Sequence, residues 1–271
     1  MLSFENITFS YPNQKELINK LSFRIKKGEF ISIVGPNGSG KSTISKLING
    51  LLLPNKGKVF FEGLDTSNRS NLNSIRKRVG IVFQNPEDQI VATTVLDEVI
   101  FGLENIKCPP EEMIDRIDDS LNKVGMLEYK DYEPYQLSGG QKQRIAVASI
   151  LAMKPKLIIF DEATSMLDPK GRDQILKVMR NLNKEGFTII NITHHMEEIF
   201  ESSKVIVLNS GKIVMEGTPF EIFNNSEVIT NNNLKLPFVI RIRDKLIKQG
   251  LNISNHVISL EELLSELWKY R

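Results

Sequence analysis

Apolar positions along the chain form two different strand patterns. Residues 2–9 and 21–25 alternate apolar with polar side chains, which predicts half-buried strands of an antiparallel sheet. Later runs are apolar at successive positions, namely Phe30–Val34, Val79–Phe83, Leu157–Phe160 and Thr188–Ile192. Strands of a parallel sheet are covered by helices on both faces, so these runs predict a parallel sheet.

Helical patterns separate the uniformly apolar runs. The clearest has apolar residues at i, i+3, i+4 and i+7, which are Ile44, Leu47, Ile48 and Leu51. The fold class is therefore α/β, with a mostly parallel sheet and an amino-terminal antiparallel β subdomain. Gly, Gln, Asp or His residues follow the strand ends, and open parallel sheets bind ligands at that edge.

Composition and charge exclude several classes of protein. The chain has 271 residues, 41% hydrophobic and 25% charged, which disfavours disorder and fibrous repeats. A net charge of +2 predicts no nucleic-acid partner. Cys108 is the only cysteine, so no internal disulfide can form and a reducing compartment is expected. No apolar run approaches the roughly 18 residues of a membrane span, so any membrane role must act through a partner.

Two segments differ from the rest in composition. Residues 85–120 carry ten acidic side chains against two basic ones, a local charge of −8. From residue 224 onward, asparagines mark a linker that is followed by Pro237 and two helical patterns. The second pattern opens with Ser259 and Glu262 at capping-box spacing.

A phosphate-binding loop is expected after the first uniformly apolar run. Residues 35–42 match the motif G-x-x-x-x-G-K-[ST] between a predicted strand and a predicted helix. The motif and the threonine after it comprise Gly35, Pro36, Asn37, Gly38, Ser39, Gly40, Lys41, Ser42 and Thr43. Glycines let backbone amides converge on phosphate oxygens at a helix N-terminus. Lys41 would contact the β- and γ-phosphates of a nucleotide, and the Ser42 hydroxyl would bind Mg²⁺. The alternative is a glycine-rich turn that binds nothing.

Asp161 and Glu162 supply the second half of this site. They follow the apolar run Leu157–Phe160 directly. Asp161 could hold Mg²⁺ through its water shell, and Glu162 could act as the base for the attacking water. Two acidic residues at an exposed strand end are the simpler alternative.

A pentapeptide at 137–141 identifies the family that the chain resembles. The pentapeptide consists of Leu137, Ser138, Gly139, Gly140 and Gln141. Together with the phosphate loop and residues 160–162, it resembles the ATP-binding cassette of ABC proteins over residues 1–223. The resemblance implies a helical subdomain at about 85–152. The resemblance implies head-to-tail dimers in which this signature closes on ATP held by the other cassette. A glycine turn before a helix is the alternative.

The same resemblance assigns roles to isolated residues. Tyr11 matches the aromatic residue that stacks on adenine, although a core tyrosine is also consistent with its position. Gln84 matches the glutamine that senses Mg²⁺ and the attacking water. Asp168 lies in a segment similar to the D-loop, and His194 matches the switch histidine. His195 stands where most cassettes have Asp, and we expect no catalytic role for it.

A narrower resemblance is carried by residues 83–95 and the carboxyl-terminal tail. Asn85, the stretch 92–94 and Glu162 resemble the first of two paralogous ATPases of energy-coupling factor transporters. This implies a linker at 224–236 and a helical dimerisation domain at 237–271. The implied partners are a paralogous ATPase or a second copy, a transmembrane coupling subunit and a substrate-binding membrane subunit. The implied function is to power uptake of a vitamin or similar micronutrient from the cytoplasmic face of the cell membrane, as a peripheral protein.

The acidic segment is a candidate surface for the transmembrane partner. We expect Glu87, Asp88 and Gln89, together with Asp97 and Glu98, to form a groove for basic coupling helices. A solvated acidic face is the alternative, because charge runs usually have no partner.

Other functions remain open on sequence alone. Cobalt- or nickel-type importers share much of the 83–95 segment. A non-transport cassette is disfavoured, because only about 94 residues separate Thr43 from Leu137 and leave no room for a long coiled coil. A degenerate cassette that only binds ATP is disfavoured by Glu162, His194 and the complete signature.

Overall fold

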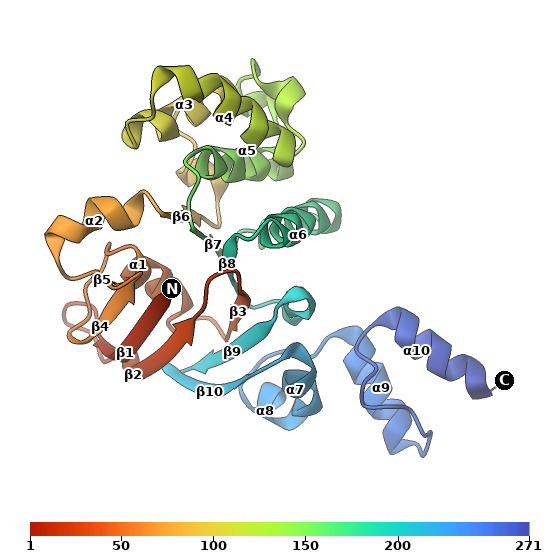
Figure 1. The fold of residues 1–271 in the computed structure, drawn as a ribbon. Coiled ribbons are helices and arrows are strands. Elements are labelled where there is room, and N and C mark those ends of the chain that lie inside the picture. Colours follow the sequence, from red (N-terminus) through yellow and green to blue (C-terminus); the bar gives the residue numbers. More distant parts are fainter. Residues whose placement is uncertain (271) are drawn as a thin grey trace.

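Two sheets with different pairing form the core of the computed structural model, which describes residues 1–270 (Figure 1). An antiparallel sheet has the order β2 (Ile18–Ile25), β1 (Leu2–Phe9), β4 (Lys56–Phe61) and β5 (Leu64–Asp65). A six-stranded sheet has the order β10 (Lys212–Gly217), β9 (Lys204–Asn209), β3 (Phe30–Val34), β8 (Thr188–Thr193), β7 (Leu157–Asp161) and β6 (Val79–Val82).

Both predicted strand patterns are confirmed. The alternating segments pair antiparallel, with Leu2 opposite Ile25. The uniformly apolar runs pair parallel in the larger sheet, and every residue of β3, β6, β7 and β8 is buried. β9 extends this sheet parallel to β3, and β10 closes its edge antiparallel to β9. The α/β fold with an antiparallel amino-terminal sheet follows directly from these pairings.

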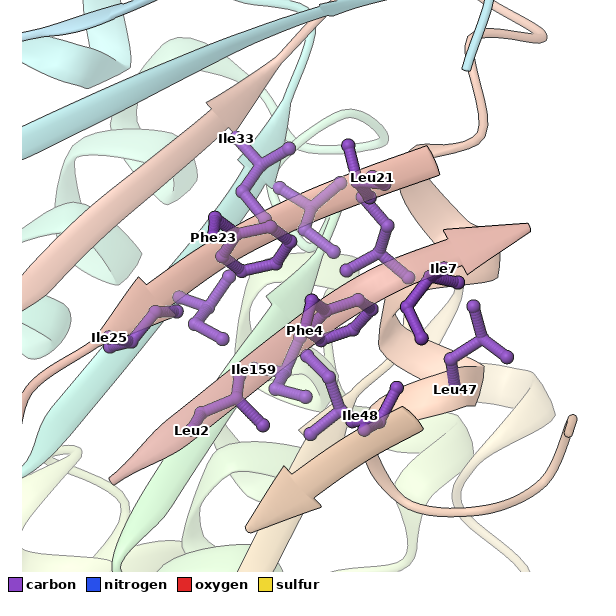
Figure 2. Packing of buried hydrophobic residues seen from close by; sticks show 14 of the residues in the cluster. Leu2, Phe4, Ile7, Leu21, Phe23, Ile25, Ile33, Leu47, Ile48 and Ile159 are labelled. Carbon is purple, nitrogen blue, oxygen red and sulfur yellow. The ribbon is translucent and has the colours of Figure 1, made fainter. Parts of the chain in front are cut away.

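The antiparallel sheet packs on one face of the parallel sheet. Figure 2 shows Leu2, Phe4 and Phe23 close to Ile33 and Ile159 of the parallel strands. The rings of Phe4 and Phe23 are stacked with centroids 4.4 Å apart. Helix α1 (Lys41–Ile48) contributes buried side chains to the same cluster. Alternate residues of the parallel strands face a second cluster, so the sheet is buried on both sides.

The helix after the phosphate loop is shorter than its apolar pattern predicts. It ends at Ile48, and Gly50 has a φ of +66°. The backbone therefore leaves the helical conformation before Leu51, whose side chain is 53% exposed. The prediction that Leu51 belongs to this helix is therefore wrong.

A group of helices packs beside the parallel sheet and reaches its second face through α5. It contains α3 (Val95–Asn105), α4 (Pro110–Lys123) and α5 (Gly139–Ala152), which pack together in the upper part of Figure 1. Helix α6 (Pro169–Lys184) shares their hydrophobic cluster, and α2 (Arg69–Arg76) lies beside β5 and β6. The helical group falls within residues 85–152, and it connects to the sheet directly after β6 and directly before β7.

The carboxyl-terminal region is helical and partly packed on the core. It consists of α7 (Pro219–Asn224), α8 (Ser226–Asn231), α9 (Phe238–Lys248) and α10 (Leu260–Leu267). The segment 224–236 is not a simple linker, because it contains α8 and buries Ile229 and Leu234 in one cluster with Val205 of β9. The capping box of Ser259 and Glu262 forms at the start of α10, as predicted. Within residues 1–270, no helix has both the length and the apolar character needed to cross a bilayer.

A buried arginine holds the last helices together. Arg243 of α9 is 2% exposed, and its guanidinium donates to the carbonyls of Asn255 (2.9 Å) and Val257 (3.1 Å). It also donates to the carbonyl of Phe223 at 3.4 Å and to the carboxylate of Asp244 at 2.8 Å. One cation therefore connects α7, α9 and the segment that precedes α10.

We predict that Arg243→Met destabilises this region by roughly 2–4 kcal/mol, because it leaves buried carbonyls without a donor. Hydrogen exchange of the α9 amides measures the change in opening free energy. Arg241→Met, which removes an exposed arginine from the same helix, is the matched control and should have little effect. Equal effects of the two substitutions would contradict the role of the buried guanidinium.

Candidate active site

The phosphate loop joins β3 to α1 in a conformation that requires glycine. Gly38 and Gly40 have φ angles of +78° and +102°. At Gly35 a Cβ atom would lie 2.2 Å from the carbonyl oxygen of Leu208, so any side chain there is excluded. Lys41 is 4% exposed, and its Nζ donates to the carbonyls of Gly35 (2.9 Å) and Pro36 (3.2 Å). The loop thus holds an ammonium group beside the N-terminus of α1, where backbone amides favour anions.

Asp161 is tied to α1 from the end of β7, a strand that is separated from β3 by β8. Its Oδ1 accepts a hydrogen bond from Ser42 Oγ at 2.9 Å, and its Oδ2 accepts one from Ser45 Oγ at 2.7 Å. Burial raises the pKa of the Asp161 carboxyl above its usual value, and the two hydroxyl donors oppose that shift. Sequence reasoning missed Ser45, which faces Asp161 because it lies one helical turn after Ser42.

Glu162 lies between Lys41 and His194. Its Oε1 is 3.4 Å from Lys41 Nζ, and its Oε2 is 3.2 Å from His194 Nδ1. The backbone of Glu162 has a φ of +52°, and its amide donates to the carbonyl of Ile192 on β8 at 2.8 Å. Parallel pairing of β3 with β8 and of β8 with β7 therefore places Lys41 and His194 against Glu162 from distant parts of the sequence.

A cavity of about 320 Å³ lies over these groups. Its walls come from the phosphate loop, α1 and three other loops, and the lining residues are Leu17, Asn37, Gly38, Gly40, Lys41, Ser42, Thr43, Gln84 and Glu162. Gln84 reaches it from the loop after β6. Tyr11 lies close by, with its hydroxyl 3.3 Å from Thr43 Oγ1 and its ring edge-on to Phe9. Six residues predicted to bind ATP thus line one hollow: Asn37, Gly38, Gly40, Lys41, Ser42 and Thr43.

The signature segment forms a second, separate cavity. Ser138 caps α5, and its amide and hydroxyl form a reciprocal capping box with Gln141. A cavity of about 460 Å³ lies between this helix start and the D-loop segment, and its lining includes Ser138, Gly139, Gly140, Gln141, Arg144, Leu167, Asp168 and Gln174. Asp168 caps α6 through the amide of Gly171 at 2.8 Å. Leu137 is buried and anchors the segment in the helical cluster.

Two glutamines hold the loop that carries Gln84. The amide of Phe83 donates to Gln89 Oε1 at 3.0 Å, and the carbonyl of Phe83 accepts from Gln143 Nε2 at 2.9 Å. Gln143 is fully buried on α5, two residues after the signature. Sequence reasoning missed it, because a glutamine on a helix gives no sign of burial.

The acidic segment is only partly a surface feature. Glu87 is exposed and pairs with Lys142 of α5, whose side chain lowers the pKa of the Glu87 carboxyl. Asp88 is also exposed, and Asp97 accepts from the Thr94 hydroxyl at 2.7 Å. A surface hollow of about 370 Å³ lies beside Glu87, and its lining residues include Ile90, Val91, Ala92, Thr93, Pro134, Tyr135 and Lys142.

The position of Glu98 contradicts part of the predicted acidic groove. Its side chain is 4% exposed, and Oε2 accepts from the amides of Val91 (2.9 Å) and Ala92 (3.1 Å). The expectation that Glu98 faces a partner is wrong, because its carboxylate satisfies backbone donors inside the chain.

Comparisons with known proteins agree with this geometry. A family profile described as "ABC transporter" matches residues 18–165. The energy-coupling factor transporter ATP-binding protein EcfA1 of Clostridium perfringens is 48% identical over 273 residues, covering 98% of this chain and 97% of that protein. The EcfA1 protein of Fusobacterium nucleatum is 50% identical over 264 residues, with 97% of each chain covered.

Solved structures give the same result. A structure of cbiO1 from Clostridium perfringens, described as part of the ABC transporter complex cbiONQ, has a TM-score of 0.79 at 36% identity and covers 91% of this chain and 98% of its own. The cassette MJ0796, solved as a dimer, has a TM-score of 0.72 at 30% identity and covers 81% of this chain and 99% of its own. The chain belongs to the ABC transporter ATPases and, within them, to the EcfA1 family of ATP-binding subunits of energy-coupling factor transporters.

Proposed function

We propose that this transport-coupled ATPase hydrolyses ATP in a site shared by two cassettes. The cavity of the phosphate loop holds the nucleotide, and Ser138 with the amides of Gly139 and Gly140 approaches it from the other cassette. Gly139 supports this arrangement, because a Cβ atom there would meet nothing within 4 Å in its own chain. MJ0796 was solved as a dimer in a post-hydrolysis state bound to ADP and Pi, and its 30% identity to this chain supports the same assembly.

The contact of Lys41, Glu162 and His194 at the cavity is the observation that carries the mechanism. Lys41 neutralises charge on the β- and γ-phosphates, while Glu162 accepts the proton of the attacking water. His194 holds the Glu162 carboxylate from its far side, and Gln84 orients the water. Tyr11 lies beside α1 where an adenine ring can stack, and Asp168 lies at the edge of the interface with the second cassette.

Mg²⁺ fits the oxygen donors beside Asp161. The carboxylate receives two hydrogen bonds from neutral hydroxyls, and burial raises its pKa, so a bound cation would stabilise its charged form. Ser42, Gln84 and Asp161 would hold the ion, the last through water, in the oxygen coordination that Mg²⁺ prefers. When bound, Mg²⁺ neutralises phosphate charge and orients the terminal phosphoryl group.

The surface hollow beside Glu87 is the proposed docking site for a transmembrane coupling subunit. Its lining combines the exposed acids Glu87 and Glu133 with apolar side chains, and the exposed Asp88 is adjacent to Glu87 in the sequence, which suits a basic amphipathic helix. Gln89 accepts from the amide of Phe83 and so links the hollow to the loop that carries Gln84. The complete assembly contains a paralogous ATPase or a second copy and a substrate-binding membrane subunit, with this chain peripheral on the cytoplasmic face. The membrane subunit selects the vitamin or other micronutrient.

We predict that Glu162→Gln abolishes turnover and traps an ATP-bound dimer. The amide keeps the shape of the side chain but cannot accept the proton of water, so kcat should fall about a thousandfold or more. Phosphate release measures kcat, and size-exclusion chromatography with ATP measures the dimer. Glu185→Gln, at a carboxylate that pairs with Lys123 away from the site, is the control. Turnover near the wild-type rate in Glu162→Gln would remove Glu162 as the base.

We further predict that reversing Glu87 and Asp88 to Lys prevents assembly with the membrane partner. The double reversal places like charges against a basic helix, while the phosphate loop is untouched. Copurification from detergent-solubilised membranes and nucleotide binding are the two readouts. Reversing Glu111 and Asp115, exposed acids on α4, changes net charge equally and serves as the control. Unchanged copurification of the Glu87 and Asp88 variant would contradict the docking site.

A further inference from the structure

A buried carboxylate lies beneath the active site and has no role in the mechanism above. Glu198 belongs to the 3-10 segment η4 (Met196–Glu201) and is 1% exposed. Its Oε1 accepts from Thr164 Oγ1 at 2.5 Å, and its Oε2 accepts from Asn191 Nδ2 at 3.2 Å. Arg172 Nε lies 3.8 Å from Oε1. Thr164 and Asn191 are each 1% exposed, so the network is shielded from water.

The partners of Glu198 come from the segments that carry the proposed catalytic groups. Thr164 lies two residues after Glu162, and Asn191 lies three residues before His194 on β8. Arg172 lies in the first turn of α6, directly after the D-loop. One carboxylate therefore joins the turn after β7, the first turn of α6 and strand β8.

We propose that Glu198, through Thr164 and Asn191, is a positioning residue that fixes Glu162 relative to His194 for hydrolysis. This inference rests on the proposed roles of Glu162 and His194. Glu162 occupies the left-handed region, which L-residues adopt only when the surrounding contacts hold them there. The hydrogen bond from Thr164 to Glu198 anchors the turn after β7 that contains Glu162. Charge-assisted bonds of this kind are short and strongly directional, which suits a positioning role.

Arg172 supplies the positive charge opposite Glu198 and also contacts His195. Its Nη2 lies 3.4 Å from His195 Nε2, and a guanidinium can only donate, so His195 accepts as a neutral ring. Burial, followed by the charges of Arg172 and His194, lowers the pKa of the His195 imidazole. A neutral imidazole at this position cannot neutralise Arg172. The ion-pair partner of Arg172 in the described structure is Glu198.

Paired substitutions at Thr164 test the proposal in the full-length chain assembled with its ATPase partner. Thr164→Val keeps the shape of the side chain but removes the donor, whereas Thr164→Ser keeps the donor. We expect Thr164→Val to lower kcat about ten- to a hundredfold with KM for ATP within about twofold, and Thr164→Ser to restore kcat to within about threefold of wild type. Phosphate release over a range of MgATP concentrations measures both constants.

Two further variants test whether the loss of kcat depends on the Glu198 carboxylate. Glu198→Gln should lower kcat like Thr164→Val, because its amide nitrogen cannot accept from Asn191. Glu197→Gln removes a charge from the exposed neighbour and should leave kcat unchanged. Thermal unfolding and binding of a fluorescent ATP analogue identify any variant that fails to fold. If Glu198→Gln does not fold, the comparison of Thr164→Val with Thr164→Ser still decides the question.

The Glu162→Gln variant, measured in parallel, separates this proposal from the assignment of the base. An inactive Glu162→Gln together with a fully active Thr164→Val would overturn the positioning network alone. An active Glu162→Gln would overturn the base itself. Equal losses in Thr164→Val and Thr164→Ser, or a rise in KM at constant kcat, would also overturn the positioning role. In the Glu162→Gln background, Thr164→Val should leave the ATP-bound dimer intact, and loss of that dimer would contradict an effect on the chemical step.

Discussion

Parallel pairing of β3, β8 and β7 is the constraint on which the site depends. It aligns the carboxyl ends of three strands at one edge of the sheet, and each strand is followed by a loop with different chemistry. Lys41 follows β3, Glu162 follows β7 and His194 follows β8, so their contacts depend on register rather than on proximity in sequence. A shift of one residue in any of these pairings would turn a strand's buried side chains to the opposite face and separate the three groups.

The charges at this edge are partly or fully withdrawn from water, and each is matched by hydrogen bonds. Asp161 receives two hydroxyls, Glu162 contacts an ammonium and an imidazole, and Glu198 receives a hydroxyl and an amide. Withdrawal from water strengthens these interactions and makes loss of any partner costly. The donors and acceptors therefore hold the site in one arrangement, as a phosphoryl-transfer reaction that depends on positioning and charge requires.

Sequence patterns predicted the strands, and the loop between β3 and α1, because their signals are local. Uniform apolar runs indicate burial on both faces, and the loop from Gly35 to Ser42 specifies its own backbone. Burial of Glu98, Gln143 and Glu198 could not be predicted, since charged and amide side chains are usually exposed and their partners lie on distant segments. Helix α8 was missed for a related reason: asparagines disfavour a helix locally, but Ile229 and Leu234 gain enough burial against β9 to order the segment.

Helix α5 connects the two cavities to the proposed membrane-facing surface. Ser138 caps its first turn, Lys142 pairs with Glu87 one turn later, and Gln143 holds the carbonyl of Phe83 beside Gln84. These contacts lie within six consecutive residues, a span over which a helix is stiff. We therefore expect a movement of the signature to displace the loop that carries Gln84 and the surface hollow beside Glu87 together. In the proposed dimer, closure of one cassette over the ATP of the other would thus act on the membrane subunit without a separate linkage. The helix proposed to contact the nucleotide of the other cassette also holds the proposed docking surface of its own.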